Sequence, residues 1–469
     1  MGLKIYNSFT KQKEEFKPIV PGRVGMYVCG PTVYGPPHVG HARSYTNFDT
    51  VFRYLQYLGF KVKYVQNITD VGHLVGDGDD GEDKILKQAK KEQVDPYEIA
   101  YKYETMYFDA MAKLNILKPS ISARATGFIP QMIDMVQTLL DKGYAYISKD
   151  GNIYYRVHKF ASYGQLSNRR LENNLSGERI EVAGDKENPE DFALWKKADG
   201  GHLMKWKSPW GWGYPGWHLE CSTLSKFFLG NTFDIHGGGI DNIFPHHECE
   251  CAQSEVANGT KFVNYFMHNN LVTVNGTKMG KSLGNFITLE DLFKEFDPQY
   301  VRYFILLFHY RSPIDFTKDA IKNAGEQLEK IKTTYQTVFQ VACGKETAPK
   351  TGEAKEILSN FENAMNEDFN TPLAISELLK FVKLSKQIKE TNNVSLASEM
   401  LFVMNKIAFV LGLDFGKTEE KQDAGESEKL LEIISDVRTR LRAEKNYQMS
   451  DYIRDRLAES GITVNDKKI

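Results

Sequence analysis

The sequence predicts an α/β protein with a parallel sheet, an inserted domain and a helical C-terminal part. Two observations lead to this fold class. Strand, loop, helix and strand patterns follow one another over residues 25–69, and long charged helical patterns with few glycines begin after about residue 318. The first arrangement is a βαβ unit, from which parallel nucleotide-binding sheets are built. The second is typical of a helical bundle.

The βαβ unit is predicted element by element. Gly25–Gly30 reads as a short buried strand, and the three prolines of Pro31–Pro37 exclude regular structure there. His38–Leu58 has helical periodicity and is followed by Gly59, a residue typical of the position after a helix. Lys61–Thr69 then alternates as a strand does.

An insertion is expected between two halves of this core. The catalytic sheet is assigned to residues 1–117 and 211–318, the second part including a strand at Phe233–His236 and a helix opened by Pro245. Residues 118–210 form the predicted insertion, which contains a hairpin pattern within 143–157 and a polar segment at 173–188.

The C-terminal third is expected to be helical. A bundle is assigned to residues 319–415, with helical periods at 324–341, 353–367, 372–390 and 395–411. Residues 416–469 follow as a small region with a polar linker and a helical pair at 429–445 and 450–460.

Composition restricts the classes of function. The chain has 469 residues, 41% of them hydrophobic, and a net charge of −2, so a nucleic acid would have to be held by local basic patches. Five cysteines, an odd number, argue against a disulfide framework. No signal-peptide pattern is visible, and the longest apolar candidate, Val301–Phe308, is too short to span a membrane. We expect a monomeric cytoplasmic protein without a membrane partner.

His38-Val39-Gly40-His41 is the first motif with chemical meaning. It lies where the proline loop becomes a helix, and a helix N-terminus with a close glycine suits a triphosphate. Imidazole N–H groups could stabilise charge that develops on a phosphate. A polar surface segment or half of a metal site would also fit these residues.

Lys278-Met279-Gly280-Lys281-Ser282 is the second motif. Its two lysines flank a glycine turn and could hold a departing pyrophosphate, or the segment could be a solvated basic turn. A Walker A loop is rejected, because Asn275 stands where that pattern requires its first glycine.

A possible metal site is scattered along the chain. His246 and Glu250 are four residues apart on a predicted helix and share a face, and thiolates from Cys29 and Cys221 could complete a four-coordinate zinc site. Cys249 and Cys251 compete with Glu250 for the role of ligand, and burial as small apolar groups is an alternative for each cysteine.

With these groups in place, the chain resembles the class I aminoacyl-tRNA synthetases, and among them the cysteinyl-tRNA synthetase family. Pro31–His41 is similar to that family's HIGH region, and Lys278–Ser282 to its KMSKS loop with Gly280 in the serine position. The family-specific phrases follow the same order along the chain: Tyr27–Tyr34, Pro215–Ser222, Phe233–Asp241, Phe244–Glu248 and Lys281–Asn285.

The resemblance implies a Rossmann-like catalytic domain with a small C-terminal anticodon-binding region at 416–469, and it implies roles for individual residues. Cys29, Cys221, His246 and Glu250 become the ligands of one zinc ion, which leaves Cys249 and Cys251 as neighbours. The catalytic residues are His38, His41, Lys278 and Lys281. ATP, accompanied by Mg²⁺, is expected at Pro31, Thr32, Gly40, His41 and Lys281, and cysteine at Gly30, Thr69, Trp217, His236 and Asp241. From the sequence itself, the candidate RNA-facing charges are Arg438, Arg440, Arg442, Lys445, Arg454 and Arg456, although a solvated helix face that also carries Glu444, Asp451 and Asp455 would fit them equally.

The implied activity is ATP-dependent attachment of L-cysteine to tRNA(Cys), releasing AMP and diphosphate. Zinc would bind the cysteine thiolate and so distinguish cysteine from serine. Two alternatives are a ligase that joins cysteine to an amino-sugar and a non-catalytic RNA-binding paralogue. The helical region after residue 318 argues against the first, and the intact His38, His41, Lys278 and Lys281 argue against the second.

Overall fold

The computed structural model describes residues 2–75, 81–169, 185–280, 284–416 and 424–459. For residue 278 and for residues 424–432 and 458–459 it describes the backbone only. The polar segment at 173–188 therefore lies largely outside the described residues. The chain divides into two compact units, residues 1–414 and 415–469.

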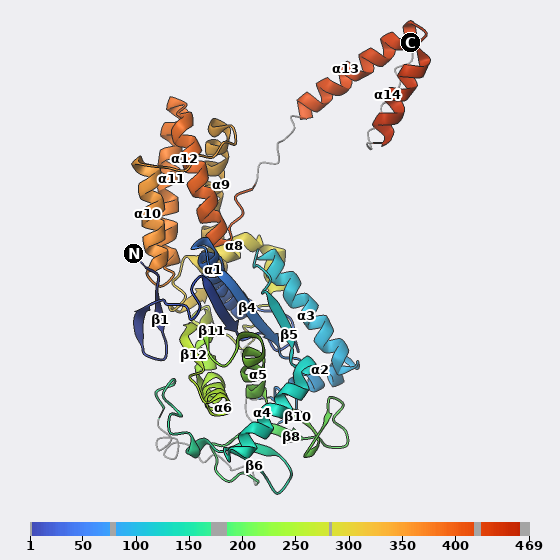
Figure 1. Ribbon diagram of the computed structural model, residues 1–469. Helices are drawn as coiled ribbons and strands as arrows, with labels where there is room; N and C mark the ends of the chain where they lie inside the picture. The colour runs from blue at the N-terminus through green and yellow to red at the C-terminus, as the bar shows by residue number, and fades with distance from the viewer. Residues whose placement is uncertain (1, 76–80, 170–184, 281–283, 417–423, 460–469) are drawn as a thin grey trace. The chain divides into compact units, whose positions relative to one another are not determined.

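The centre of the first unit is a sheet of five parallel strands (Figure 1). In spatial order they are β12 (Val263–Asn269), β11 (Phe233–Gly239), β3 (Arg23–Val28), β4 (Lys61–Ile68) and β5 (Ile121–Arg124). The chain builds outward from β3 to β5 on one side and then from β11 to β12 on the other. This doubly wound order places a topological switch point between β3 and β11, where parallel sheets of this kind bind ligands.

Helices cover both faces of this sheet, and β11 shows which helix covers which face. Gly237 lies against the Phe48 ring of α1 (Val39–Tyr57), since a Cβ on Gly237 would come within 2.4 Å of that ring. The neighbouring His236 points to the other face, where it contacts Glu250 of α6 (Glu248–Asn258). Because successive strand residues alternate between faces, α1 and α6 cover opposite sides. Helix α5 (Trp217–Leu229) packs beside α6.

The predicted βαβ unit is confirmed. β3, α1 and β4 follow one another, and β3 and β4 pair in parallel from Arg23 with Lys61 to Val28 with Gln66. α1 begins directly after His38, whose side chain accepts a hydrogen bond from the Gly40 N–H. Its end is followed by Gly59 in the left-handed region, at φ +88°, as expected for a residue that terminates a helix.

The insertion contains a second, antiparallel sheet, and the structure places both ends of the insertion differently from the expected bounds 118 and 210. The sheet has the order β6-β7-β8-β10-β9, with bounds Ala145–Ile147, Ile153–Tyr155, Phe192–Lys197, Gly211–Pro215 and Trp206–Ser208. β10 thus begins where the core was expected to resume, but it pairs with β8 and β9. At the other limit, β5 lies after residue 117 but pairs with β4 of the main sheet. Short strands have no sequence signal for which sheet they join. α4 (Ile129–Asp141) follows β5 and packs on α5 and α6.

The remaining elements of the first unit surround this core. β1 (Lys4–Asn7) and β2 (Gln12–Glu15) form a hairpin, and β14 (Thr277–Lys278), β13 (Val272–Val274) and β15 (Ile314–Phe316) form a three-stranded sheet. Four helices are connecting elements: α2 (Lys84–Glu92), α3 (Pro96–Lys113), α7 (Leu289–Glu295) and α8 (Pro298–Leu306).

The helical bundle is present where the periodicity predicted it. Its helices are α9 (Lys318–Ala342), α10 (Gly352–Asn366), α11 (Thr371–Thr391) and α12 (Val394–Leu411), and α9 packs on both α11 and α12. The choice of Val301–Phe308 as the longest apolar candidate was wrong. Among the described residues, α12 is a helix long and apolar enough to cross a membrane, but half of it is buried inside the protein. Its contacts with α9, α10 and α11 account for its apolar character.

A buried charged group joins α1 to the bundle. We call it the Asp49 cluster: Asp49 and Arg53 of α1 and Arg302 of α8, all at most 4% exposed. The Asp49 carboxylate contacts the Arg53 Nε at 2.8 Å and an Arg302 terminal nitrogen at 2.5 Å. Both guanidinium groups also donate to carbonyl groups where α3 and α12 end, at Asn115, Phe409 and Leu411.

The second unit contains α13 (Ala424–Ala443) and α14 (Tyr447–Glu459), which pack on each other. The sequence predicted this helical pair but placed the start of each helix later. Arg438 was expected to face RNA, and this prediction was wrong, because it is 3% exposed and donates to the Ser450 carbonyl at 3.3 Å. Arg454 contacts Asp451 at 3.0 Å and Arg442 lies 3.8 Å from the same carboxylate. The side chains of Arg440, Lys445 and Arg456 are exposed.

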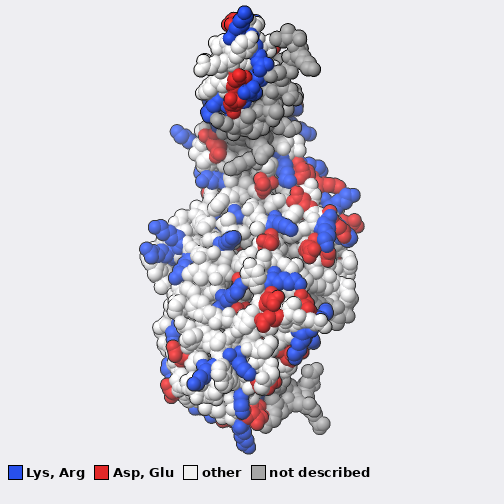
Figure 2. All heavy atoms as spheres, turned by 90° about the vertical axis from the view of Figure 1, so that its right-hand side faces the viewer, with Lys and Arg blue, Asp and Glu red and all other residues white. Residues whose placement is uncertain are grey.

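The surface charge agrees with the near-neutral composition. Figure 2 shows Lys and Arg interspersed with Asp and Glu over one face of the molecule. Such a surface gives no strong field of one sign, so an anionic partner must be held by local contacts.

Candidate active site

A cavity of about 300 Å³ opens at the switch point of the main sheet. Its walls come from four parts of the chain: the segment after β3, the start of α1, the segment after β11 and the segment after β12. These contribute Cys29, Gly30, Pro31 and Thr32; His38, Gly40, His41, Ser44 and Tyr45; Gly238–Asn242; and Asn269–Val272, joined by Trp217 and Met279. The cavity thus lies at the carboxyl ends of the strands, where a doubly wound sheet is expected to bind ligands.

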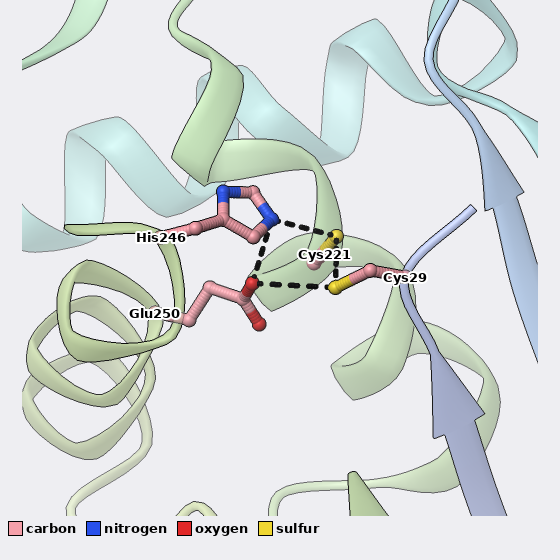
Figure 3. A group of neighbouring side chains, drawn as sticks. All are labelled: Cys29, Cys221, His246 and Glu250. Atoms are coloured by element: carbon pink, nitrogen blue, oxygen red, sulfur yellow. Dashed lines mark hydrogen bonds and ion pairs between the residues drawn. The ribbon is translucent and has the colours of Figure 1, made fainter. Parts of the chain in front are cut away.

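The four predicted metal ligands lie together (Figure 3), and one of them, Cys29, lines this cavity. We call Cys29, Cys221, His246 and Glu250 the donor cluster. The Cys29 and Cys221 sulfurs are 3.7 Å apart, and the Cys221 sulfur is 3.5 Å from the His246 Nε2. The Glu250 Oε1 is 2.9 Å from that nitrogen and 3.8 Å from the Cys29 sulfur. All four residues are buried.

These distances fit a tetrahedral zinc ion. Zinc bonds of about 2.3 Å to sulfur and about 2.0 Å to nitrogen place two sulfurs about 3.8 Å apart and a sulfur and a nitrogen about 3.5 Å apart. Both values agree with the donor cluster, whereas the His246–Glu250 contact is shorter, as in a direct ion pair. Two thiolates, one imidazole and one carboxylate are also a donor set that zinc accepts.

The protonation of the donor cluster is uneven. Burial by itself raises the pKa of the Cys221 thiol, but hydrogen bonds from Cys29 and His246 outweigh burial and lower this pKa to about 6. Burial and the neighbouring Cys221 raise the pKa of Cys29 well above its ordinary value. Burial would lower the pKa of His246, but the Glu250 carboxylate raises it to about 10. Negative charges that lie close together in a buried site oppose each other's ionisation. A divalent cation that replaces the protons would stabilise all of these groups in their deprotonated forms.

Two further histidines orient the ligands. The His218 Nδ1 lies 3.0 Å from the His246 Nδ1, which leaves the His246 Nε2 directed at the donor cluster. The His236 Nε2 lies 2.6 Å from the Glu250 Oε2, which directs Oε1 to the same place. Partners of this kind fix the orientation of metal-binding side chains.

A second possible ligand set replaces Cys221 and His246 with His236 and His247. His247 lies 3.1 Å from the Cys29 sulfur and 2.8 Å from the His268 Nε2. This set has one thiolate instead of two, and it would take His236 away from its bond to Glu250. Zinc has a strong preference for thiolate, so the donor cluster is the better site.

His38 and His41 lie stacked at the start of α1, with ring centroids 3.9 Å apart. The His38 Nδ1 accepts from the Gly40 N–H at 3.1 Å, and the His41 Nδ1 accepts from the His38 N–H at 3.3 Å. In the neutral rings these bonds place the proton on Nε2 of each residue. Both histidines line the cavity.

The other predicted residues divide into three groups. Gly30, Pro31, Thr32, Gly40, Trp217 and Asp241 line the cavity. Thr69 and His236 do not: Thr69 is buried behind the wall and donates to Glu220 at 2.7 Å, and His236 binds Glu250. For Lys278 the structure describes only the backbone, and Lys281 is not among the described residues. Met279, which lies between these two lysines, lines the cavity.

Sequence reasoning missed several buried polar residues around the cluster. Glu220, at 0% exposure, accepts from Thr69 and Asn67, and burial raises its pKa well above the ordinary value. His218, His247 and His268 are further buried histidines near the cluster. The available signals were that His247 directly follows the predicted ligand His246 and that His218 lies three residues before Cys221, but nothing in the sequence pairs His268 with them.

Gly30 provides a testable position in the wall. A Cβ on this residue would lie 1.6 Å from the Asn67 carbonyl oxygen, which is backbone and cannot move aside. We expect Gly30→Ala to destabilise the protein by about 1–3 kcal/mol and to lower ligand affinity, because β3 and β4 must separate. Urea unfolding and ATP binding would measure this. Gly127→Ala, with open space around it, is the control and should change neither.

Comparison with known proteins identifies the family. Residues 15–326 match the model of the tRNA synthetases class I (C) catalytic domain, and residues 360–416 match the DALR domain. The cysteine–tRNA ligase of Chlorobaculum tepidum is 48% identical over 99% of this chain and 97% of its own length. That of Thermus thermophilus is 46% identical over 100% and 98%. The chain belongs to the cysteine–tRNA ligase family.

Solved structures support the synthetase fold of this cysteine–tRNA ligase family member. The Mycobacterium tuberculosis methionyl-tRNA synthetase, in complex with methionyl-adenylate, matches 83% of this chain and 90% of its own with a TM-score of 0.59. A LeuRS ternary complex from Agrobacterium radiobacter matches 85% of both chains with a TM-score of 0.61. Each is 13% identical to this chain, so the likeness concerns the fold alone. The expected α/β catalytic fold with a helical C-terminal part is confirmed.

Proposed function

We propose that this chain activates L-cysteine with ATP and transfers it to the 3′ end of tRNA(Cys), and that one zinc ion selects cysteine over serine. The observation that carries the proposal is that Cys29 belongs to two features at once. It belongs to the donor cluster and also lines the cavity that holds His38 and His41. A cation in the cluster would therefore border the space in which ATP and the amino acid react.

Zinc in the donor cluster would supply a position that prefers a thiolate to a hydroxyl as an additional ligand. Serine differs from cysteine only in that atom, and a pocket that recognised shape alone would reject it weakly. The chain's own residues would hold the rest of the amino acid. Trp217 borders the cavity beside His246, and the Asp241 carboxylate at the rim suits an α-ammonium group.

His38 and His41 would stabilise the α-phosphate during attack by the cysteine carboxylate. Their Nε2–H groups are donors, and the α1 N-terminus adds a partial positive charge. Pro31, Thr32 and Gly40 would line the nucleotide position. Lys278 and Lys281 would stay with the leaving diphosphate, and Mg²⁺ would accompany ATP.

The terminal ribose of tRNA(Cys) would then attack the adenylate carbonyl and release AMP. Of the residues proposed for RNA contact, Arg440, Lys445, Arg454 and Arg456 have exposed side chains. Arg438 is excluded by its burial. Since contacts to phosphate are screened by salt, this part of the binding should weaken as ionic strength rises.

We also propose a monomeric cytoplasmic enzyme. Residues of one chain supply every described wall of the cavity and all four donors, so the site needs no second copy. Two buried sulfurs at 3.7 Å must stay reduced to bind a metal, which suits a reducing compartment. Light scattering at several protein concentrations tests the oligomeric state.

ATP–pyrophosphate exchange with cysteine and with serine tests the main proposal. We expect exchange with cysteine and a kcat/KM for serine that is lower by more than about 1,000-fold, because a shaped pocket alone gives only about 10- to 200-fold. Equal exchange with the two amino acids would contradict zinc selection. Charging of tRNA(Cys) then separates the ligase from an amino-sugar ligase and from a paralogue that binds RNA without catalysis.

A further inference from the structure

A loop after β4 reaches the active-site wall from outside the predicted motifs. Its two ends pair with each other: Leu74 bridges Asp83, and the Lys84 N–H donates to the His73 carbonyl at 2.9 Å. Asp83 fixes both ends, since its carboxylate accepts from the Gly72 N–H at 2.7 Å and from the Ile85 N–H at 2.8 Å. These described contacts hold the two ends of the loop together.

The loop base lies directly against the segment that leads into α5. A Cβ on Gly72 would come within 2.3 Å of the Pro215 carbonyl oxygen, and Gly72 has a φ of +77°. Only glycine allows both this backbone conformation and this approach. The contact places His73, at 7% exposure, next to Trp217.

The His73 ring stacks on Trp217, with ring centroids 3.9 Å apart and planes 9° apart. Trp217 also stacks with His246 of the donor cluster, at 4.2 Å and 24°. If both imidazole rings stacked on the same face of the Trp217 indole at these centroid distances, they would overlap each other. The Trp217 indole is therefore held between His73 and His246.

His73 also joins a charged side chain to the cavity wall. The Lys84 ammonium lies 2.7 Å from the His73 Nε2, and the His73 Nδ1 lies 2.5 Å from the Thr32 hydroxyl. An ammonium group can only donate, so Nε2 accepts and the ring proton is on Nδ1, from which it is donated to Thr32. The Thr32 hydroxyl then accepts from His73 and directs its own hydrogen elsewhere. Thr32 and Trp217 both line the cavity.

We propose that His73 and Lys84 are positioning residues for adenylate formation, which rests on the function proposed above. His73 holds the Trp217 indole that borders the cysteine position. Through the bond from Lys84, it also makes the Thr32 hydroxyl a hydrogen-bond donor toward an anionic group in the cavity, a carboxylate or the α-phosphate. One imidazole thus sets both an apolar wall and a polar donor of the same site.

Two substitutions separate these two tasks. His73→Phe keeps a ring against Trp217 but loses both hydrogen bonds, so we expect kcat for cysteine-dependent pyrophosphate exchange to fall about 10-fold to 100-fold with little change in the KM for cysteine. His73→Gln keeps an amide that can accept from Lys84 and donate to Thr32 but loses the ring. It should raise the KM for cysteine about 10-fold with a smaller effect on kcat.

Lys84 supplies a matched series. Lys84→Met should reproduce the kcat loss of His73→Phe, and Lys84→Arg should restore most of it, because the guanidinium can still donate to His73. Lys87→Met, one turn further along α2 and exposed, is the control and should leave both constants unchanged. Zinc content and the melting temperature are measured for every variant.

The outcomes distinguish this inference from the proposed function. If the parent enzyme shows no cysteine-dependent exchange, the function is wrong. If the parent is active and both His73 variants stay within twofold of it, the inference is wrong. It is equally overturned if the two variants change kcat and KM alike, or if they lose zinc or melt well below the parent, since His73 would then be a structural residue only.

Discussion

Replacement of Cys221 by serine is expected to leave the chain folded but to remove stoichiometric zinc and cysteine-dependent exchange. Cys221 is 1% exposed and its sulfur lies 3.7 Å and 3.5 Å from the neighbouring donors of the cluster. A serine hydroxyl fits the same space but stays protonated at neutral pH and is a poor zinc ligand. Since loss of a residue that only orients a ligand lowers metal affinity about 10- to 100-fold, loss of the ligand itself should exceed that range.

Metal content by mass spectrometry and far-ultraviolet circular dichroism would measure the two parts of this expectation. Cys249→Ser is the matched control, because Cys249 is buried to the same extent and lies next to Glu250 but outside the donor cluster. It should keep one zinc ion per chain. Loss of zinc from the control with retention in Cys221→Ser would show that a different set of residues binds the metal.

Removal of the Asp49 carboxylate is expected to cause the largest loss of stability. Asp49→Ala leaves Arg53 and Arg302 as two buried guanidinium groups without a counter-charge, at 4% and 0% exposure. It also leaves the Leu117 N–H without its partner at 2.9 Å. Breaking a buried ion pair in this way costs about 3–5 kcal/mol in the free energy of unfolding.

Urea unfolding of the parent and of Asp49→Ala would measure this loss. Asp291→Ala is the control, since its carboxylate contacts Lys294 at 2.9 Å on the surface and such pairs contribute about 0–1 kcal/mol. A double variant with Arg302→Met should lose less than the sum of the single variants, because it removes one of the unpaired charges. A loss below about 1 kcal/mol for Asp49→Ala would contradict the assigned role of the cluster.

The sequence predicted the elements that have long and regular patterns. The βαβ unit and the four bundle helices are where periodicity placed them, because each pattern extends over enough residues to distinguish helix from strand. β5 has four residues and β10 five, too few to show which sheet they would join. The helix at α12 was predicted, but its apolar character was overlooked, although the composition of Val394–Leu411 shows it.

The candidate site divides in the same way. Spacing alone placed His246 and Glu250 on one face of a helix, and their 2.9 Å contact follows from it. Cys29 and Cys221 are 192 residues apart, and their pairing came from the family resemblance. Thr69 and His236 were expected in the cysteine pocket because the segments that contain them resemble those of the family's pocket. Neither side chain lines the cavity: Thr69, just past the end of β4, donates to Glu220, and His236 of β11 contacts Glu250 of α6. The resemblance does not specify where these two side chains point. His73 has no signal in the sequence at all.

Helix α1 also has a mechanical consequence. It is a rod of 19 residues, or about 28 Å, that begins directly after His38 at the wall of the cavity. Further along, Arg43 donates to carbonyl groups at the end of α8, and the Asp49 cluster fastens α1 to the ends of α3 and α12. Gly412, where α12 ends, has no side chain to keep Arg302 at a distance, since a Cβ there would meet its guanidinium. The helix that begins beside the two histidines is therefore also anchored to α3, α8 and α12, so a displacement of the bundle is expected to act on α1 as a whole.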